Sequence, residues 1–372
     1  MSHPVNHRSG PVGVGIIGAG VISEQYLDSL TAFPDVKVVA IGDLFPAVAQ
    51  ARAAEYGVPV SGEVDRVLES DDIDIVVNLT IPQVHAEVAL SAIAAGKHVY
   101  NEKPIALDSD SAAELLQVAA RANLRVGAAP DTFLGAGAQA VRRAVARGDI
   151  GEPQTALTLM QQSGPESWHP NPAFLFQRGA GPLFDIGPYY LTALIQLFGA
   201  VTEVAAISGK AQAARVVGSG PRAGETFTVD VPTHISAGLG FADGRSATSI
   251  YSFDSPLGRV LFEVTGTEAT LGVPDPNNFG GDLLIRRRED EDWRILDSTQ
   301  PVSGRGTGVL DLARAIREDR PHRASGALAA HVLDIMVGAI DAAENHRVVT
   351  LTSNVESAEL LPDDWDPYLP TL

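Results

Sequence analysis

The sequence predicts an α/β protein with an N-terminal doubly wound parallel sheet and a C-terminal α+β domain built on a large, mostly antiparallel open sheet. Three observations lead to this fold class. Short apolar runs alternate with alanine-rich helical stretches as far as residue 128, a glycine-rich turn joins the first run to the first helix, and many alternating runs then follow without helices between them. A chain of 372 residues with 45% hydrophobic content is long enough for both domains.

The first strand is expected at residues 12–17, where an apolar, β-branched run leads directly into a glycine-rich turn. Gly18 can supply the tight turn, and Gly20 lets the backbone approach a pyrophosphate closely. The pyrophosphate charge would rest on the amides at the start of the next helix, at Val21 and Ile22. A strand, this turn and a helix in that order are typical of dinucleotide-binding Rossmann domains.

The second strand, expected at 36–42, ends at an acidic residue, Asp43. In Rossmann domains a carboxylate at this place accepts hydrogen bonds from the adenosine ribose hydroxyls and repels a 2′-phosphate, which favours NAD over NADP. Asp43 could also be a solvated turn acid before Pro46. Ser23 stands at the place of the third glycine of the turn and is small enough for close helix packing.

The rest of the N-terminal sheet is predicted from three more buried runs; these strands are expected at 73–79, 98–100 and 125–128, with helices at 84–95 and 111–122. An Asn-Glu-Lys-Pro segment follows the run at 98–100. This places Lys103 at the carboxyl end of a parallel strand, where open α/β sheets bind their ligands. Lys103 is therefore the first candidate for catalytic chemistry, and the alternative is a surface lysine near a strand end.

The second domain is predicted from its alternating runs, with strands expected at 155–161, 202–208, 226–240, 246–253 and 259–265, and helices at 137–147, 309–318 and 327–345. The helices would cover one face of this sheet, so the other face is an expected oligomer interface. The expected division is a flexible tail at 1–11, a dinucleotide-binding domain at 12–128 and a substrate and oligomerisation domain at 129–372.

A second group of candidate residues lies just before an amphipathic run at 191–198. Asp185 and Tyr189 are four residues apart, so on a helical turn both side chains project from one face toward a common point. Asp185 could instead cap the helix, and Tyr189 could be a core tyrosine with a satisfied hydroxyl.

With these motifs, the chain from Val12 onward resembles the glucose-fructose oxidoreductase, inositol dehydrogenase and rhizopine catabolism family, known as Gfo/Idh/MocA. The resemblance rests on the glycine turn at 18–20, on Ile81-Pro82 with His85, on the segment 95–104 that contains Glu102-Lys103-Pro104, and on the segment 185–189. It implies a nicotinamide-dependent oxidoreductase that acts on sugars, sugar derivatives or cyclitols, with the active site between the domains.

By the same resemblance, the family's lysine falls on Lys103, its motif aspartate on Asp185 and its acid/base, often a histidine, on Tyr189. The tyrosine leaves open whether Tyr189, Tyr190 or His169 handles the proton. The further residues expected at the cofactor are Thr80, Pro82, His85 and Glu102, together with Lys103.

The physical requirements of alcohol oxidation agree with these roles. Hydride leaves the carbon for the nicotinamide ring while the hydroxyl proton leaves to a base. An ammonium such as Lys103 would lower the pKa of the Tyr189 phenol, and it could also stabilise a developing alkoxide. The hypothesis is that Lys103 and Tyr189 handle the proton and that Asp185 orients them.

Other histidines and aromatic residues receive weaker assignments. Trp168 and His169 lie in a proline-rich loop, where they can stack on and hydrogen-bond a sugar ring or serve only in loop packing. His85 is expected to cap a helix or to pack beside the cofactor. His98 and His234 are expected to be structural.

The composition excludes several classes of function. A formal charge of −19 disfavours a large nucleic-acid footprint, and the chain has no cysteine for disulfides or thiolate sites. Neither a membrane-spanning run nor a secretory signal is visible. No histidine and carboxylate cluster has metal-ligand spacing, so no metal is predicted. The arginines at 286–288 precede four acids and are expected in an exposed hairpin. A cytoplasmic enzyme for a small molecule, in a homodimer or homotetramer, is expected.

Three functions remain open from the sequence. The leading one is reversible NAD-dependent dehydrogenation of a sugar or cyclitol. A related class of enzyme uses bound NAD transiently, to oxidise a sugar carbon, cleave a glycosidic bond and return the hydride. The third is a non-catalytic nucleotide-sensing regulator. Lys103 and Asp185 argue against it, because a sensor needs no proton-handling pair.

Overall fold

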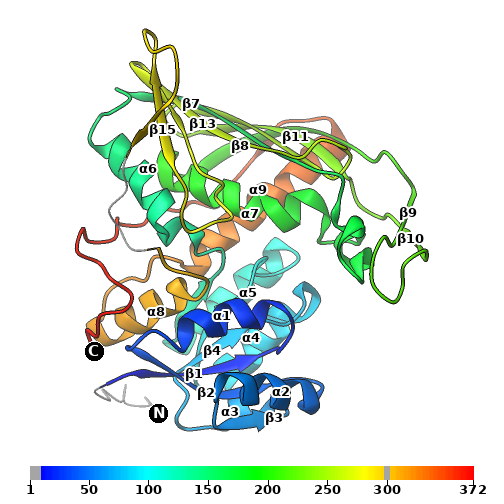
Figure 1. Cartoon of the computed structure of the whole chain (residues 1–372), viewed down its shortest axis with the longest axis vertical. Coiled ribbons are helices and arrows are strands. Elements are labelled where there is room, and N and C mark those ends of the chain that lie inside the picture. Colours follow the sequence, from blue (N-terminus) through cyan, green and yellow to red (C-terminus); the bar gives the residue numbers. More distant parts are fainter. Residues whose placement is uncertain (1–9, 297–301) are drawn as a thin grey trace.

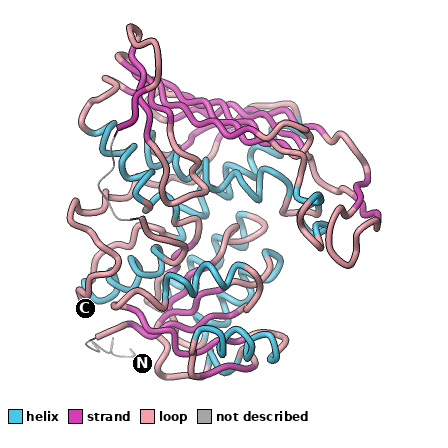
Figure 2. Tube along the Cα trace, in the orientation of Figure 1, coloured by secondary structure: helices cyan, strands magenta, loops and turns pink. Residues whose placement is uncertain are grey.

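The computed structural model describes residues 10–296 and 302–372, so most of the predicted N-terminal tail lies outside the described part of the chain. A parallel sheet and a larger sheet lie toward opposite ends of the molecule, with helices packed between them (Figure 1). Figure 2 shows the same two layers of strands separated by helices. This arrangement confirms the predicted fold class.

The N-terminal sheet has six parallel strands in the order β3-β2-β1-β4-β5-β6. They are β1 (Val12–Ile17), β2 (Val36–Gly42), β3 (Val60–Gly62), β4 (Ile75–Asn78), β5 (His98–Asn101) and β6 (Val126–Ala128). The helices here are α1 (Ile22–Leu30), α2 (Pro46–Tyr56), α3 (Asp65–Leu68), α4 (His85–Ala94) and α5 (Ser109–Arg121). Every residue of β1 and β4 is buried, and strands buried on both faces require the continuous apolar runs that the sequence carries.

The strand order brings three carboxyl ends together. β1, β4 and β5 are neighbours, and the order changes direction between β1 and β4. In doubly wound sheets such a switch point is where ligands bind. The glycine turn follows β1, Thr80 follows β4, and Lys103 follows β5. The predicted cofactor residues and the predicted catalytic lysine therefore share one edge of the sheet.

The second sheet has nine strands in the order β16-β15-β14-β13-β7-β12-β11-β8-β17. Neighbours are antiparallel except for β7 and β12, which are parallel. The strands are β7 (Pro153–Gln161), β8 (Val201–Gly209), β11 (His234–Phe241), β12 (Ser246–Ser252), β13 (Arg259–Gly266), β14 (Ala269–Gly272), β15 (Leu283–Arg287), β16 (Arg294–Leu296) and β17 (Val349–Thr350). Short strands β9 (Ala214–Val216) and β10 (Thr226–Thr228) pair separately.

Helices cover one face of this sheet. They are α6 (Ala136–Ala146), α7 (Gly181–Phe198) and α9 (Gly326–Asn345), and they lie between the large sheet and the N-terminal domain (Figure 1). α7 contacts β12 and β11, and α9 contacts β8. None of the described helices covers the other face (Figure 1). That face leaves Leu157 and Ile207 exposed at 39% and 77%.

Two features differ from the predictions. The expected strand at 226–240 is interrupted between Thr228 and His234, and the intervening Pro232 has no N–H for a ladder. α8 (Thr307–Glu318), which the sequence places with the second domain, packs against α1 and β6 of the first domain.

Among the described helices, α9 is long and apolar enough to cross a membrane by length and composition, but 67% of that stretch is buried against the rest of the protein. Core packing explains its apolarity.

Candidate active site

The glycine turn has the geometry of a phosphate cradle. Gly18 has a φ of +100°, and a Cβ at this position would lie 2.6 Å from the carbonyl oxygen of Leu79. A Cβ on Gly20 would meet nothing within 4 Å, so the backbone there faces open space. Ser23 is fully buried and its hydroxyl donates to the Gly20 carbonyl at 2.6 Å. The turn is therefore closed on the protein side and open on the ligand side, as pyrophosphate binding requires.

Asp43 reaches this turn from the end of β2. Its Oδ2 accepts a hydrogen bond from the Ala19 amide at 2.8 Å, and its Oδ1 accepts one from the Phe45 amide at 2.9 Å. The two bonds fix the carboxylate beside the cradle, and each oxygen keeps a lone pair for a ribose hydroxyl. Asp43 is thus more than a solvated turn acid.

The end of β4 is held by a buried network of amides and an imidazole. Asn78 donates from Nδ2 to Asn101 Oδ1 at 2.9 Å, and its Oδ1 accepts from the Thr80 hydroxyl at 2.7 Å. His85 is 1% exposed, with Nδ1 2.7 Å from the Pro104 carbonyl and Nε2 3.0 Å from the Thr80 carbonyl. No side-chain cap is formed at the start of α4, so His85 packs and ties the two strand ends together. The predictions named His85 and Thr80 but missed Asn78 and Asn101.

Glu102 fixes the backbone of the catalytic candidate. It is 7% exposed, its Oε1 accepts from the Tyr26 hydroxyl at 2.8 Å, and its Oε2 accepts from the Lys103 amide at 2.9 Å. Both carboxylate oxygens are thus engaged within the protein. Pro82, two residues after Thr80, is the first residue of the short 3₁₀ turn η1 (Pro82–Val84).

Lys103 and Asp185 meet across the two domains. Lys103 Nζ donates to Asp185 Oδ1 at 2.8 Å and to the Asp185 backbone carbonyl at 2.7 Å. The side chains are 16% and 25% exposed, so the pair is sheltered but reachable. Burial alone would lower the pKa of Lys103, but Asp185, Tyr189 and Glu102 together raise it above its ordinary value. Lys103 is an ammonium at neutral pH.

Asp185 does not cap the helix, because α7 begins at Gly181 and its N-cap is Ala180. Tyr189 follows one turn later on the same face. Its ring centroid lies 5.4 Å from Lys103 Nζ, and the residue is 5% exposed. The helical spacing of four residues thus brings Asp185 and Tyr189 to the same lysine, as the sequence predicts.

Lys103 lowers the pKa of Tyr189, as predicted, but the net shift of this pKa is upward. Burial raises the pKa of Tyr189 above its ordinary value, and the opposing effects of Lys103 and Arg305 do not reverse this. The charge of Lys103 is visible in the local motif, whereas the loss of solvent around the Tyr189 ring depends on tertiary packing. Tyr189 is therefore a neutral phenol at neutral pH.

Tyr190 and His169, the other two residues considered for proton transfer, are held in packing contacts of their own. Tyr190 is fully buried and packs against Tyr251 at 5.8 Å between ring centroids, on the side of α7 that faces the sheet. His169 packs at 5.5 Å from both Trp168 and Phe174. Burial lowers its pKa, and the charge of Asp185 opposes that effect. Trp168 is 62% exposed.

An arginine that the predictions missed anchors the loop of Trp168 and His169. Arg215 is 6% exposed and forms ion pairs with Glu166 and Asp254. It also donates to the carbonyls of Ser163 and Phe253 at 3.2 and 3.0 Å. The loop is thereby fixed to the end of β12. Local sequence gives no signal for this, since the partners come from two distant segments, 163–166 and 253–254.

A second missed arginine, Arg305, reaches Tyr189 from the loop before α8. Its Cζ lies 5.4 Å from the centroid of the Tyr189 ring. The signal that could have drawn attention to it is the sequence Gly304-Arg305-Gly306, in which Gly306 has a φ of +102°. The remaining predicted structural histidines match their assignment: His98 accepts from the Arg125 amide at 2.9 Å, and His234 lies 3.2 Å from the Ser236 hydroxyl.

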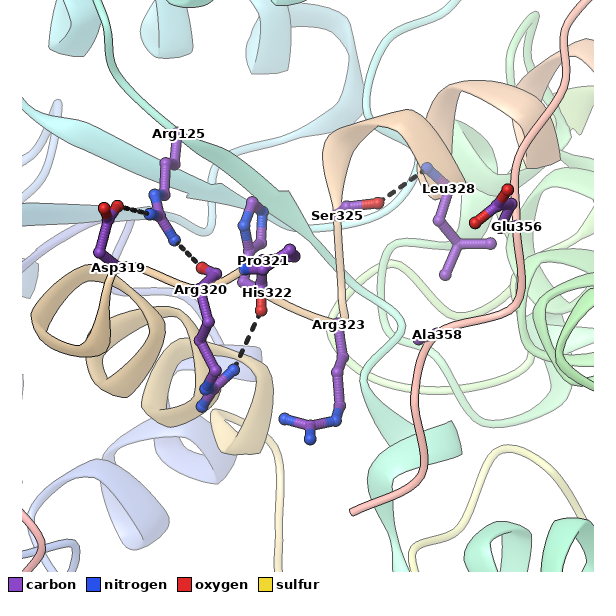
Figure 3. A pocket seen from close by; sticks show the side chains of 10 residues that line it. All are labelled: Arg125, Asp319, Arg320, Pro321, His322, Arg323, Ser325, Leu328, Glu356 and Ala358. Carbon is purple, nitrogen blue, oxygen red and sulfur yellow. Dashed lines mark hydrogen bonds and ion pairs between the residues drawn. The ribbon is translucent and has the colours of Figure 1, made fainter. Parts of the chain in front are cut away.

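A hollow of about 560 Å³ is lined by Arg125 and by residues of the segment 319–328 (Figure 3). Arg125, which lines it, immediately precedes β6, whereas the candidate site lies beyond the carboxyl ends of the strands. The Arg125 guanidinium already donates to the Ala315 carbonyl at 3.1 Å and to Asp319 at 3.3 Å. The hollow is thus separate from the site around Lys103.

Comparison with known proteins gives matches to both domains. Residues 12–129 match the model of an oxidoreductase family with an NAD-binding Rossmann fold, and residues 138–272 match the GFO/IDH/MocA C-terminal domain.

Three relatives illustrate the range of similarity. An inositol 2-dehydrogenase from Rhizobium meliloti is 32% identical over 155 residues, covering 41% of this chain and 47% of that protein, so the chain aligns with about half of that relative. A 1,5-anhydro-D-fructose reductase from Ensifer adhaerens is 28% identical over 262 residues, which are 69% of this chain and 74% of that protein. A levoglucosan dehydrogenase solved with NADH and L-sorbose has the same fold, with a TM-score of 0.78, 22% identity and coverage of 92% of this chain and 99% of that one.

Proposed function

Since the chain belongs to the Gfo/Idh/MocA family of NAD-binding oxidoreductases, we propose that it transfers hydride between NAD and a secondary alcohol of a sugar, a sugar derivative or a cyclitol. The observation that carries the proposal is the meeting of Lys103, Asp185 and Tyr189 at the carboxyl edge of the Rossmann sheet. We assign Lys103 and Tyr189 to proton handling and Asp185 to orienting Lys103.

The N-terminal domain fits the cofactor. The backbone at Gly20 is open, and Asp43 is fixed beside it. Large apolar side chains are exposed around this cradle, with Val21 at 80%, Leu44 at 81% and Ile81 at 59%. A ligand with flat rings and a pyrophosphate would bury these exposed apolar groups while its pyrophosphate binds the glycine turn. Bound NAD would accept or supply the hydride.

The protein's part in the reaction concerns the substrate oxygen. With Lys103 charged and Tyr189 neutral, the site at neutral pH holds two groups that can donate a proton. This is the state that carbonyl reduction needs, because the carbonyl oxygen gains a proton as its carbon gains hydride. In the oxidative direction the same groups must first release a proton, and the Lys103 charge would stabilise the developing alkoxide.

The proposed substrate class follows from polar groups around this pair and from the names of the relatives. Asp185 is 25% exposed, and His169 and exposed Trp168 lie in the anchored loop nearby. A carboxylate, an imidazole and an indole can hydrogen-bond to and stack on a ring that bears hydroxyls. The relatives' names, an inositol dehydrogenase and an anhydrofructose reductase, fit such rings.

The test is a panel of substrates assayed in both directions. Inositols, aldoses and anhydrosugars are mixed with NAD, and ketoses and keto-inositols with NADH, while NADH absorbance is followed. Net change with one class of substrate supports the proposal. Conversion of glycosides without net NADH would indicate transient oxidation instead, and cofactor binding without any conversion would indicate a sensor.

We also propose that the uncovered face of the large sheet joins copies of this chain. Leu261, Leu159 and Ile250 lie side by side in register, and Ser236 connects them to Ile207. An apolar row across an open sheet is typical of a subunit interface. Light scattering after chromatography should give a dimer or tetramer for the wild type, and Leu159→Lys should shift it toward the monomer.

A further inference from the structure

Two cations contact the ring of Tyr189, and only one of them belongs to the proposed proton-handling pair. Lys103 Nζ and Arg305 Cζ are each 5.4 Å from the centroid of the Tyr189 ring. A cation over the face of an aromatic ring attracts it, and the attraction strengthens where water is excluded. Tyr189 is 5% exposed, so both contacts are sheltered.

Arg305 is held in place from three directions. Its Nε donates to Gln25 Oε1 at 2.8 Å, and its Nη2 donates to Asn277 Oδ1 at 2.8 Å. The backbone just after it is fixed because Asp131 Oδ2 accepts from the amides of Gly306 and Gly308, both at 2.9 Å. The guanidinium therefore has a defined orientation toward Tyr189.

Both side-chain hydrogen bonds of Arg305 go to neutral amide oxygens. Among the described residues no carboxylate forms an ion pair with it, and its Nη1 is buried without a hydrogen-bond partner. Burial alone would lower the pKa of Arg305, but the electrostatic effects of Tyr189, Glu102 and Asp131 raise it above its ordinary value, so the guanidinium stays charged. A phenolate at Tyr189 would place a further negative charge beside this guanidinium, which lies over the Tyr189 ring.

We propose that Arg305 is a positioning residue that holds the Tyr189 ring against Lys103 and favours the phenolate that forms when Tyr189 gives up its proton. This rests on the proposed function of Tyr189. In carbonyl reduction the phenol O–H bond breaks, the proton goes to the substrate oxygen and the electron pair stays on the phenolate oxygen. A bound reduced nicotinamide would supply the hydride, which completes the balance.

The first test follows the ionisation of Tyr189 without any substrate. A fluorotyrosine, which ionises at lower pH than tyrosine, is introduced at position 189, and its fluorine resonance is recorded against pH. Arg305→Met removes a unit charge 5.4 Å from the ring centroid. The titration midpoint of the fluorotyrosine should therefore rise by about one to two pH units. Arg305→Lys keeps the charge and should recover much of the shift. Arg222→Met, which removes a solvent-exposed arginine, is the matched control and should change nothing.

If Arg305→Met does not fold, Arg305→Gln replaces it in the same titration, because glutamine keeps a hydrogen-bonding group without the charge. An unchanged midpoint in the folded neutral variant would overturn the proposal. A midpoint restored equally by lysine and by glutamine would also overturn it, because charge would then not be the cause.

A kinetic cycle supplies a second test with the substrate identified by the panel. Arg305→Met should lower kcat for reduction about tenfold in the wild type and have little further effect in Tyr189→Phe. Equal losses in both backgrounds would show that Arg305 does not act through Tyr189. If no substrate is turned over, the proposed function fails, and the fluorine titration still decides the role of Arg305.

Discussion

Replacing Lys103 by methionine is the perturbation that discriminates best between a catalytic and a structural lysine. Methionine keeps much of the length of the side chain but removes the charge and the ammonium group that donates to Asp185. Two hydrogen bonds to Asp185, at 2.7 and 2.8 Å, disappear; the 2.8 Å contact is also an ion pair, whose side chains are 16% and 25% exposed.

The two expected effects differ in size. Because the pair is partly solvated, the free energy of unfolding should fall by only about 1–2 kcal/mol, which is a small part of a typical domain's stability. Loss of the proton donor and of the charge beside the substrate oxygen should lower kcat about 10²–10⁴-fold, equivalent to about 3–5 kcal/mol. Folding losses cannot account for a drop of that size.

The assay measures three quantities on the same preparations: kcat, the Kd for NADH and the urea midpoint of unfolding. The Kd should stay within about twofold, because Lys103 Nζ is engaged with Asp185 and not with the glycine cradle. Lys210→Met is the matched control, since the Lys210 ammonium also donates to a backbone carbonyl, that of Val229 at 2.9 Å, away from the site. A Lys103→Met enzyme with kcat within threefold of wild type would refute the assignment.

Three further predictions test other parts of the site. Asp43→Asn removes the charge and keeps one of the two oxygens that accept from the Ala19 and Phe45 amides, so the preference for NAD over NADP should fall about tenfold or more, as measured by fluorescence titration with both cofactors. An unchanged ratio would exclude Asp43 from this discrimination. Because the pKa values of Lys103 and Tyr189 are both raised, kcat for alcohol oxidation should rise with pH from 7 to 9, whereas kcat for carbonyl reduction should stay level or fall. A kcat for oxidation that decreases with increasing pH would contradict the assigned protonation states. Burial raises the pKa of Asp131 from 3.8 to about 6, so the folded state binds the proton more tightly than the unfolded state. The free energy of unfolding should therefore fall by about 3 kcal/mol as the pH rises from about 4 to about 6, and Asp131 should contribute little further change above about pH 6. Asp131→Asn should remove this part of the pH dependence in urea titrations; a variant with the same pH dependence as the wild type would show that Asp131 is not its source.

Local patterns were sufficient to predict much of the fold. Strands buried on both faces must be apolar throughout, so the runs at 12–17 and 73–79 identify a parallel sheet without any knowledge of their neighbours. The carboxyl end of each strand is then known, which is why Lys103 could be placed at the ligand edge. The spacing of Asp185 and Tyr189 is likewise a local, helical relation.

Other features depend on which distant segments pack together, and the sequence carries no local record of that. The parallel pairing of β7 with β12 joins residues about ninety positions apart, and α8 returns to the first domain after all strands of the second sheet except β17. Arg305 becomes part of the site only through this return. The net pKa shift of Tyr189 could not be predicted for the same reason, because burial, which outweighs the effect of Lys103, arises from tertiary packing.

The central claim is that this site moves hydride between a substrate carbon and NAD while Lys103 and Tyr189 manage the proton. The most direct measurement uses a substrate from the panel that carries deuterium on the reacting carbon, with mass analysis of the cofactor after mixing with NAD. The account predicts deuterium in the NADH formed by the wild type and at least about a hundredfold less label per unit time with Lys103→Met. Label that returns to the carbohydrate product, or label transfer that is unaffected by Lys103→Met, would contradict it.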